Sequence, residues 1–151
     1  MAKAILILDR FYWNVDRQVG VGGANKVEDV QLVQLGYFCM AALKSAQVPA
    51  EMIAAAAKVQ PGESYGGGPN ESLSVAIRLH QKLRGGVQDG VVSSASNTQG
   101  QYAPHLFWMI ISLDQNIADV LGENWPHLDK HPKCPAALSA AVKTTFKILG
   151  K

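Results

Sequence analysis

The chain has 151 residues, of which 48% are hydrophobic and 17% charged, and its formal net charge at pH 7 is +2. This length and composition are typical of one globular domain that buries its own core without disulfides or metal ions. The small net charge, with no run of lysines and arginines among aromatic residues, argues against nucleic acid as a partner. We therefore take residues 1–151 as a single domain.

The N-terminal segment 4–20 is rich in β-branched and aromatic residues, which favours an edge strand or a hairpin around Asp9 and Arg10. Its apolar run from Ala4 to Leu8 is shorter than the roughly 7–15 residues of a signal-peptide core. No segment approaches the roughly 20 apolar residues of a membrane span. We expect a chain that is cytoplasmic when synthesised and has no membrane partner.

A glycine-rich stretch, VGVGGANK (residues 19–26), precedes a helix that we expect to be central, because the chain beyond Leu35 is apolar nearly all round. Asn25 is predicted to cap this helix, with Glu28 completing a capping box and Asp29 adding negative charge to the first turn. The apolar positions at helical spacing are Val27, Val30, Val33, Tyr37 and Ala41.

Four further helices are predicted over residues 48–58, 71–83, 103–122 and 136–150, and Asn70 is expected to cap the second of these. A turn at Asp89–Gly90 interrupts the polar connection 84–101, and residues 123–135 read as loop. The apolar faces comprise Leu73, Ala76, Ile77, His80 and Leu83; Phe107, Ile110, Ile111, Leu113, Ile117 and Val120; and Leu138, Val142 and Leu149. The pattern predicts a mostly α fold: a small bundle of about five helices with a short N-terminal β element.

The sequence contains one weak internal repeat. GGAN at residues 22–25 is echoed by GGPN at residues 67–70, and a glutamine follows each near the second or third turn of the next helix. We interpret glycine followed by a capping asparagine as a structural device used twice in this chain.

Candidate catalytic residues do not form a recognised pattern. Lys26 lacks the flanking residues of a phosphate-binding P-loop, and Asn25 replaces the third glycine of a dinucleotide-binding motif. No Gly-x-Ser-x-Gly elbow is present, and the acidic residues are better explained as helix caps or loop residues. We expect a protein that is not an enzyme and has no catalytic residue and no cofactor. A small hydrolase with an unrecognised site stays open as a third alternative.

Histidines and cysteines raise a separate question of metal binding. His127, His131 and Cys134 could be combined into a zinc site, but three prolines in this segment argue against the helix that such spacing needs. We expect an ordinary surface loop and no metal. Cys39 is expected to be buried, and whether it pairs with Cys134 is left open. His80 lies on an apolar face, and we expect a core histidine with one hydrogen-bonded nitrogen.

Two segments together resemble bacterial and phage peptidoglycan-binding-like domains. VGVGGANKVEDVQLVQ is similar to the turn that leads into an x-D-V-x-x-V/L-Q helix, and SYGGGPNESLSVAIRLHQ is similar to a glycine-rich loop followed by x-A-I-x-x-F-Q. VQDGVVSSAS resembles the segment P-D-G-x-V that precedes a final helix. In this chain Gly62-Glu63 replaces an Asp-Gly pair, and His80 replaces a core phenylalanine.

The resemblance implies a small non-catalytic helical module that binds cell-wall glycan or stem peptide. Tyr65, Asn70 and Arg78 would then be the ligand-binding residues, with Tyr65 stacking on a sugar and Arg78 pairing with a carboxylate. A wall-binding module without a signal peptide is consistent with a phage lysis or tail protein, or with cargo or an accessory protein of a contractile secretion apparatus, either of which reaches the periplasm without the general export route. The alternative is a protein–protein adaptor or immunity-type protein on the same scaffold.

Overall fold

The computed structural model describes residues 3–7, 10–95 and 108–150. These residues contain five α-helices: α1 (Val27–Leu43), α2 (Ala50–Ala57), α3 (Ser72–Leu83), α4 (Met109–Leu121) and α5 (Ala136–Ile148). Two short 3-10 helices, η2 (Gly122–Asn124) and η3 (Leu128–Lys130), lie between α4 and α5. The expected mostly α fold of about five helices is confirmed.

In the described ranges, four short strands form two antiparallel pairs. β1 (Lys3–Ile7) and β2 (Arg10–Asn14) make the expected N-terminal hairpin, in which Ile5 lies opposite Tyr12. The second pair joins β3 (Val19–Gly20) to β4 (Val91–Val92). This second pair was not predicted, because two residues on each side give no periodic signal.

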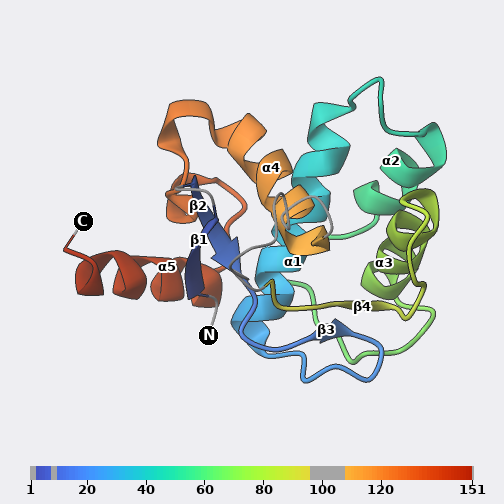
Figure 1. Cartoon of the computed structure of the whole chain (residues 1–151), viewed down its shortest axis with the longest axis horizontal. Helices are drawn as coiled ribbons and strands as arrows, with labels where there is room; N and C mark the ends of the chain where they lie inside the picture. Colours follow the sequence, from blue (N-terminus) through green and yellow to red (C-terminus); the bar gives the residue numbers. More distant parts are fainter. Residues whose placement is uncertain (1–2, 8–9, 96–107, 151) are drawn as a thin grey trace.

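Helix α1 is the centre of the molecule, as the nearly continuous apolar run beyond Leu35 predicts. It contacts α2, α4 and α5, and the ribbon shows these helices placed around it (Figure 1). The helix approaches α4 closely at Gly36, where an added methyl group would lie 2.7 Å from Cβ of Leu113. Glycine at this position therefore allows the two central helices to pack closely.

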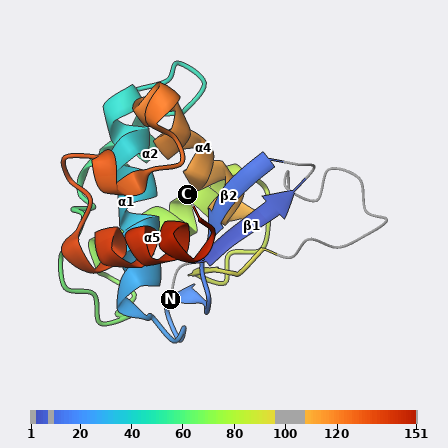
Figure 2. The ribbon, with the colours of Figure 1, turned by 90° about the vertical axis from the view of Figure 1, so that its left-hand side faces the viewer.

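An aromatic cluster fixes the hairpin onto the C-terminal helix, beside which it lies (Figure 2). Trp13 of β2 makes edge-to-face contacts with Phe11 and with Phe146 of α5, at centroid distances of 5.2 and 5.5 Å. The indole N–H of Trp13 donates a 2.8 Å hydrogen bond to the carbonyl of Pro126. The polar atom of this fully buried ring is thus satisfied, as buried indoles usually require.

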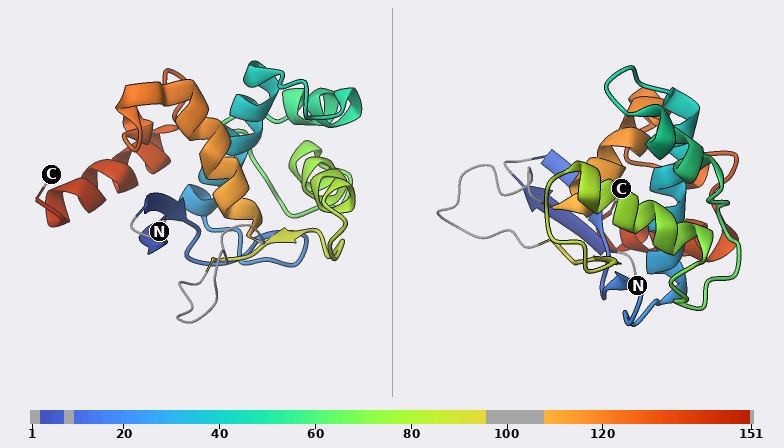
Figure 3. Two further views of the ribbon diagram at one scale, coloured as in Figure 1. Left: turned by 45° about the horizontal axis from the view of Figure 1, so that its top comes forward. Right: turned by 90° about the vertical axis from the view of Figure 1, so that its right-hand side faces the viewer.

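Four residues of the predicted apolar faces are exposed, and all four lie at helix ends. Val27 begins α1, Leu83 ends α3, Val120 is near the end of α4, and Leu149 follows α5. Within the part of the chain that the structure describes, these side chains are left uncovered, and the last turns of α5 extend away from α2 and α3 (Figure 3). The position Phe107 lies outside the described residues. The other predicted core positions are buried or half-buried.

The two predicted asparagine caps are wrong. Lys26 precedes α1 and Glu71 precedes α3, and neither helix start has a side-chain cap. Asn25 adopts a left-handed conformation with φ of 52°, whereas an N-cap residue is normally extended. Its amide instead bonds to the preceding glycine turn.

Candidate functional site

Two glutamines hold two loops in the same way. In α1, Oε1 of the buried Gln34 accepts the N–H of Gly62 at 2.9 Å, and its Nε2 donates to the carbonyl of Glu63 at 2.9 Å. In α3, Oε1 of Gln81 accepts the N–H of Gly90 at 2.9 Å, and its Nε2 donates to the carbonyl of Val91 at 2.9 Å. Each side chain therefore pairs with a glycine and the residue after it, as a neighbouring strand would.

The two glycines that these glutamines bond have positive φ, 85° at Gly62 and 78° at Gly90. Each loop therefore turns sharply at the residue that the glutamine holds. We call each pair of hydrogen bonds from one glutamine side chain a glutamine clamp. Each glutamine follows one of the Gly-Gly-x-Asn segments noted above, Gln34 nine residues after Asn25 and Gln81 eleven residues after Asn70. The interpretation of these asparagines as helix caps is wrong, so the repeat does not mark a shared capping device.

Asn25 closes the first glycine-rich segment. Its Oδ1 accepts the N–H of Gly20 at 2.7 Å, and its Nδ2 donates to the carbonyls of Gly20 and Gly23 at 2.9 and 3.1 Å. Gly20 itself approaches Gly90 so closely that a side chain would overlap the carbonyl oxygen of Gly90. A Cβ on Gly67 would lie 3.2 Å from Nδ2 of Asn25, so the two glycine-rich segments pack against each other.

A cavity of about 230 Å³ lies where the two segments meet. Its lining residues are Asn25, Val27, Val30, Gln31, Gly62, Glu63, Ser64 and Tyr65. Tyr65 is half-buried, and its hydroxyl lies 2.6 Å from the hydroxyl of Ser74. Burial is the main factor that raises the pKa of Tyr65, so the phenol stays neutral near pH 7. The structure thus places one predicted site residue, Tyr65, in a cavity built from both loops.

The other two predicted site residues lie nearby but face different surroundings. Asn70 is exposed and lines a groove of about 460 Å³ between α2 and α3. Arg78 is half-buried, and its guanidinium donates a 3.4 Å hydrogen bond to the carbonyl of Pro69. A Cβ on Gly90 would lie 3.5 Å from Nε of Arg78. Arg78 therefore bridges the loop before α3 and the loop before β4.

Glu71 orders the glycine-rich loop 66–68 from within. Its two carboxylate oxygens accept the N–H groups of Gly66 and Gly68. Asp29, in the first turn of α1, plays a similar part for the segment before the helix, since its buried carboxylate accepts the N–H groups of Asp16 and Arg17, both at 3.0 Å. These two acids hold backbone in place, which agrees with the interpretation of acidic residues as structural.

The histidines and cysteines considered as metal ligands make different contacts. Sγ of the buried Cys39 lies 3.8 Å from Nε2 of His131, and burial raises the pKa of Cys39 to about 12. His127 packs on Phe146, with ring centroids 4.4 Å apart. Cys39 and Cys134 are both free thiols. Across the described ranges, no group of three metal-ligating side chains converges.

His80 is a core residue, in the arrangement expected from its apolar neighbours. Its Nδ1 lies 2.9 Å from the hydroxyl of Tyr37, and both residues are buried. Burial, with a smaller effect of Arg84, lowers the pKa of His80 to about 4. The imidazole is therefore neutral at pH 7.

Sequence reasoning missed Asp114, which is fully buried in α4. A signal was present, because Asp114 lies between Ile110 and Ile117 on the helical stripe that faces the core. A carboxylate on such a stripe is rare unless it is paired, and this was overlooked.

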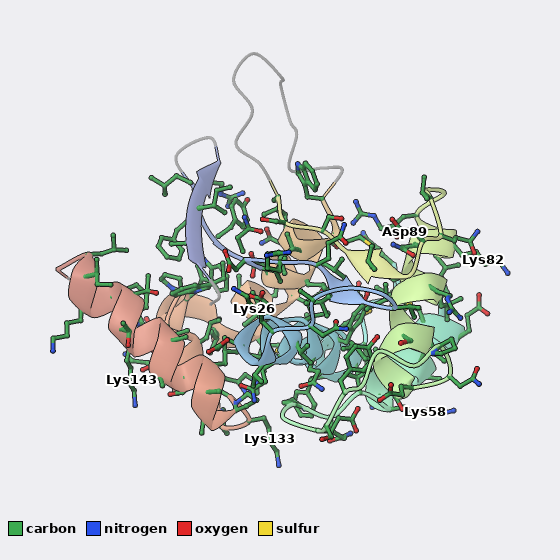
Figure 4. The ribbon with its side chains drawn as sticks, turned by 90° about the horizontal axis from the view of Figure 1, so that it is seen from below. Lys26, Lys58, Lys82, Asp89, Lys133 and Lys143 are labelled. Atoms are coloured by element: carbon green, nitrogen blue, oxygen red, sulfur yellow. The ribbon has the colours of Figure 1, made fainter. Side chains whose placement is uncertain are left out.

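The labelled lysines do not gather in one patch. Lys133 and Lys143 lie at the α5 end of the molecule, and Lys58 and Lys82 lie at the opposite end, with Asp89 on the side of Lys82 (Figure 4). Lys26 lies between these groups and forms a 2.7 Å ion pair with Asp16. Among the described helices, none has the length and apolar character needed to cross a membrane.

Comparison with known proteins finds no matching family model, no matching curated protein and no matching solved structure.

Proposed function

We propose that the chain is a non-catalytic binding module whose ligand is peptidoglycan, either its glycan or its stem peptide. The observation that carries this proposal is the cavity built jointly by the two glycine-rich segments, with Tyr65 in its wall. The segments that form it are those whose sequence resembles peptidoglycan-binding-like domains. A pocket with apolar walls and a few fixed polar groups is the usual form of a small-ligand site.

The side chains of the cavity suit a polar ligand with an apolar face. Because the hydroxyl of Tyr65 is occupied by Ser74, the ring is the part of Tyr65 that is offered to a ligand. Val27 adds an apolar surface that is 60% exposed, and Glu63 adds an exposed carboxylate that can accept hydrogen bonds from hydroxyl groups. In this proposal a sugar ring lies against Tyr65 and Val27.

The assignment as non-catalytic is supported by what the polar groups already do. Asp29 and Glu71 hold loop backbone, Gln34 and Gln81 clamp the two turns, and His80 bonds to a tyrosine in the core. A general acid or base must reach a substrate proton, and these side chains are committed elsewhere.

The proposal is tested by co-sedimentation with purified sacculi. We expect the wild-type chain to sediment with them, and Tyr65→Ala to weaken binding by about tenfold, which corresponds to roughly 1.4 kcal/mol. Asp119→Asn, at an exposed position on α4, is the matched control and should bind as the wild type does. Failure of the wild type to bind would overturn the proposal.

Arg78 and the place of action are tested separately. Arg78→Ala should weaken binding to sacculi that retain stem peptides and should leave binding to peptide-free glycan unchanged. In this proposal a phage or contractile secretion apparatus delivers the chain to the periplasm. Fractionation of cells that carry such an apparatus, with and without its function, measures that delivery.

The second candidate function is a protein–protein adaptor, favoured by the groove between α2 and α3. Its floor contains Ala54, Ala55 and Val75, of which Val75 is 45% exposed, and Asn70 lies at its edge. A stable complex with the product of a neighbouring gene, lost in Val75→Glu but kept in Tyr65→Ala, would support the adaptor over the wall-binding module.

A further inference from the structure

Three polar side chains in the lining of the Tyr65 cavity are bonded within the chain. The hydroxyl of Tyr65 lies 2.6 Å from that of Ser74, and the amide group of Asn25 bonds to the glycine turn. Oε1 of Gln31, another lining residue, accepts the N–H of Leu138 at 2.9 Å. These side chains already use polar atoms that a ligand would need, so the choice of ligand depends on the other lining residues.

Among the described residues that line this cavity, Glu63 is the one that carries a charge, and its side chain is exposed. Its backbone is fixed, because its carbonyl accepts the amide N–H of Gln34 at 2.9 Å. Its carboxylate accepts a long hydrogen bond of 3.4 Å from the N–H of Gln60. Between described residues the one ion pair joins Lys26 to Asp16, so no described lysine or arginine pairs with Glu63. The glutamine clamp therefore holds an uncompensated negative charge in the cavity wall.

The other charged groups near the cavity do not reverse this sign. The N-terminal end of α1 borders the cavity and by itself would favour an anion, but Glu28 and Asp29 place two acidic side chains in that first turn. Burial is the largest influence on the pKa of Tyr65, and the charges of Glu71 and Arg78 act on that pKa in opposite directions. The charge that the cavity offers to a ligand is therefore that of Glu63.

The remaining wall suits the apolar part of an amine. Val27 is 60% exposed, Val30 lies beside it in the lining, and the half-buried Tyr65 contributes its ring. A cation is attracted to the face of an aromatic ring, and a primary ammonium group donates three hydrogen bonds, which a carboxylate accepts. A carboxylate beside an aromatic ring and aliphatic side chains therefore complements an ammonium group carried on an apolar ring or chain.

We infer that the Tyr65 cavity selects ligands with a primary ammonium group, which pairs with Glu63 while the attached ring or chain packs on Tyr65 and Val27. The inference rests on the proposed function and narrows it, since it names a free amine as the group of peptidoglycan that is recognised. Two sources carry this group: an amino sugar of the glycan without its acetyl group, and the side-chain amine of a diamino acid in the stem peptide. Glu63 then determines specificity, because an acetylated amine has no charge to pair with it.

The first test is NMR titration of the whole chain with soluble amines, followed at the backbone amides of Ser64 and Tyr65. Glucosamine represents the glycan source, and Nα-acetyl-lysine amide represents the stem-peptide source. We expect saturable shifts with at least one of them, and the one that binds identifies the source. Its acetylated counterpart, N-acetylglucosamine or Nα,Nε-diacetyl-lysine amide, should bind at least about fivefold more weakly. Added NaCl should weaken binding of the amine alone, since salt screens an exposed ion pair.

Two matched variants separate recognition from folding. Glu63→Gln keeps the size of the side chain and an acceptor for the N–H of Gln60, and it removes the charge. We expect this variant to bind the amine and its acetylated counterpart equally and to unfold at the wild-type temperature, which shows that lost selectivity is not lost folding. Glu123→Gln, at an exposed position on η2 outside the lining, is the control and should select the amine as the wild type does.

Sacculi distinguish this inference from the proposed function. Chemical acetylation of their amines should reduce co-sedimentation of the wild type by at least about fivefold and leave that of Glu63→Gln unchanged. Equal binding of the wild type to treated and untreated sacculi would overturn the inference and leave peptidoglycan binding standing. A wild type that binds a soluble amine but no sacculi would overturn the proposed function alone. Failure of both soluble amines to bind, or unchanged selectivity in Glu63→Gln, would overturn the inference.

Discussion

The hydroxyl of Tyr37 and Nδ1 of His80 lie 2.9 Å apart in the core and join α1 to α3. We predict that Tyr37→Phe lowers the free energy of unfolding by about 1–3 kcal/mol, since it leaves a buried imidazole nitrogen unpaired. Chemical denaturation measures this effect. His80→Leu in the Tyr37→Phe background should cost less than it does alone, because the partner is already lost. Simple additivity of the two changes would show that the contact contributes nothing.

His80 should make stability depend on pH. Its pKa is lowered from 6.5 to about 4 in the folded chain, so between these values the unfolded chain binds a proton that the folded chain does not. Stability therefore falls as the pH drops through this range, by up to about 3 kcal/mol.

The measurement is the difference in unfolding free energy between the wild type and His80→Gln from pH 4 to 7. Subtracting the two curves cancels the opposite effect of Asp114, whose raised pKa makes stability fall as the pH rises from 3.8. A difference that does not change with pH would contradict the neutral, buried imidazole.

The two glutamine clamps should act locally and independently. Gln34→Leu removes the hydrogen bonds to Gly62 and Glu63, and Gln81→Leu removes those to Gly90 and Val91 together with a bond to the carboxylate of Asp89. We expect amide hydrogen exchange to speed up by about tenfold or more at Gly62 in the first variant and at Gly90 in the second, corresponding to at least about 1.4 kcal/mol of local stability. Exchange that rises equally at both glycines in either variant would indicate global destabilisation instead.

Gly36→Ala should destabilise the fold by about 1–3 kcal/mol, since a methyl group would lie 2.7 Å from Cβ of Leu113. Thermal unfolding measures this loss. Because the clash is with Cβ itself, Leu113→Ala should not rescue it. Gly86→Ala is the matched control, as a Cβ there meets nothing within 4 Å. Rescue by Leu113→Ala would show that the helices separate easily.

The helical core was predictable because long apolar patterns require burial. Helix α1, for example, is apolar on every side beyond Leu35, and only a central position covers all of those sides. Its start was mistaken, because the pattern Asn25 with Glu28 fits a capping box whichever backbone conformation Asn25 adopts. The left-handed φ of Asn25 depends on the contacts of Gly20 with Gly90, which join residues 70 positions apart in the sequence.

The candidate site was predictable only in part. Tyr65 was proposed from the resemblance and lines a cavity, whereas Asn70 and Arg78 lie in different surroundings, which the linear sequence does not reveal. The sequence repeat marked a glutamine after each Gly-Gly-x-Asn segment, but Gln34 lies nine residues after Asn25 and Gln81 eleven residues after Asn70, so the spacing did not reveal their common role. Asp114 could have been found from its helical position, whereas its surroundings depend on β2, which packs against α4 from the far end of the chain.

The glutamine clamps hold their loops through backbone N–H and C=O groups, so the anchoring does not depend on the side chains that the loops carry. Gln34 holds its loop at residues 62–63, and the nearby Ser64 and Tyr65 are not among its bonds. Side chains next to the clamps can therefore change during evolution, and insertions can be designed between residues 84 and 88, without loss of the hydrogen bonds that hold the loops. In chains of this kind, the surface chemistry of the loops would change faster than the fold.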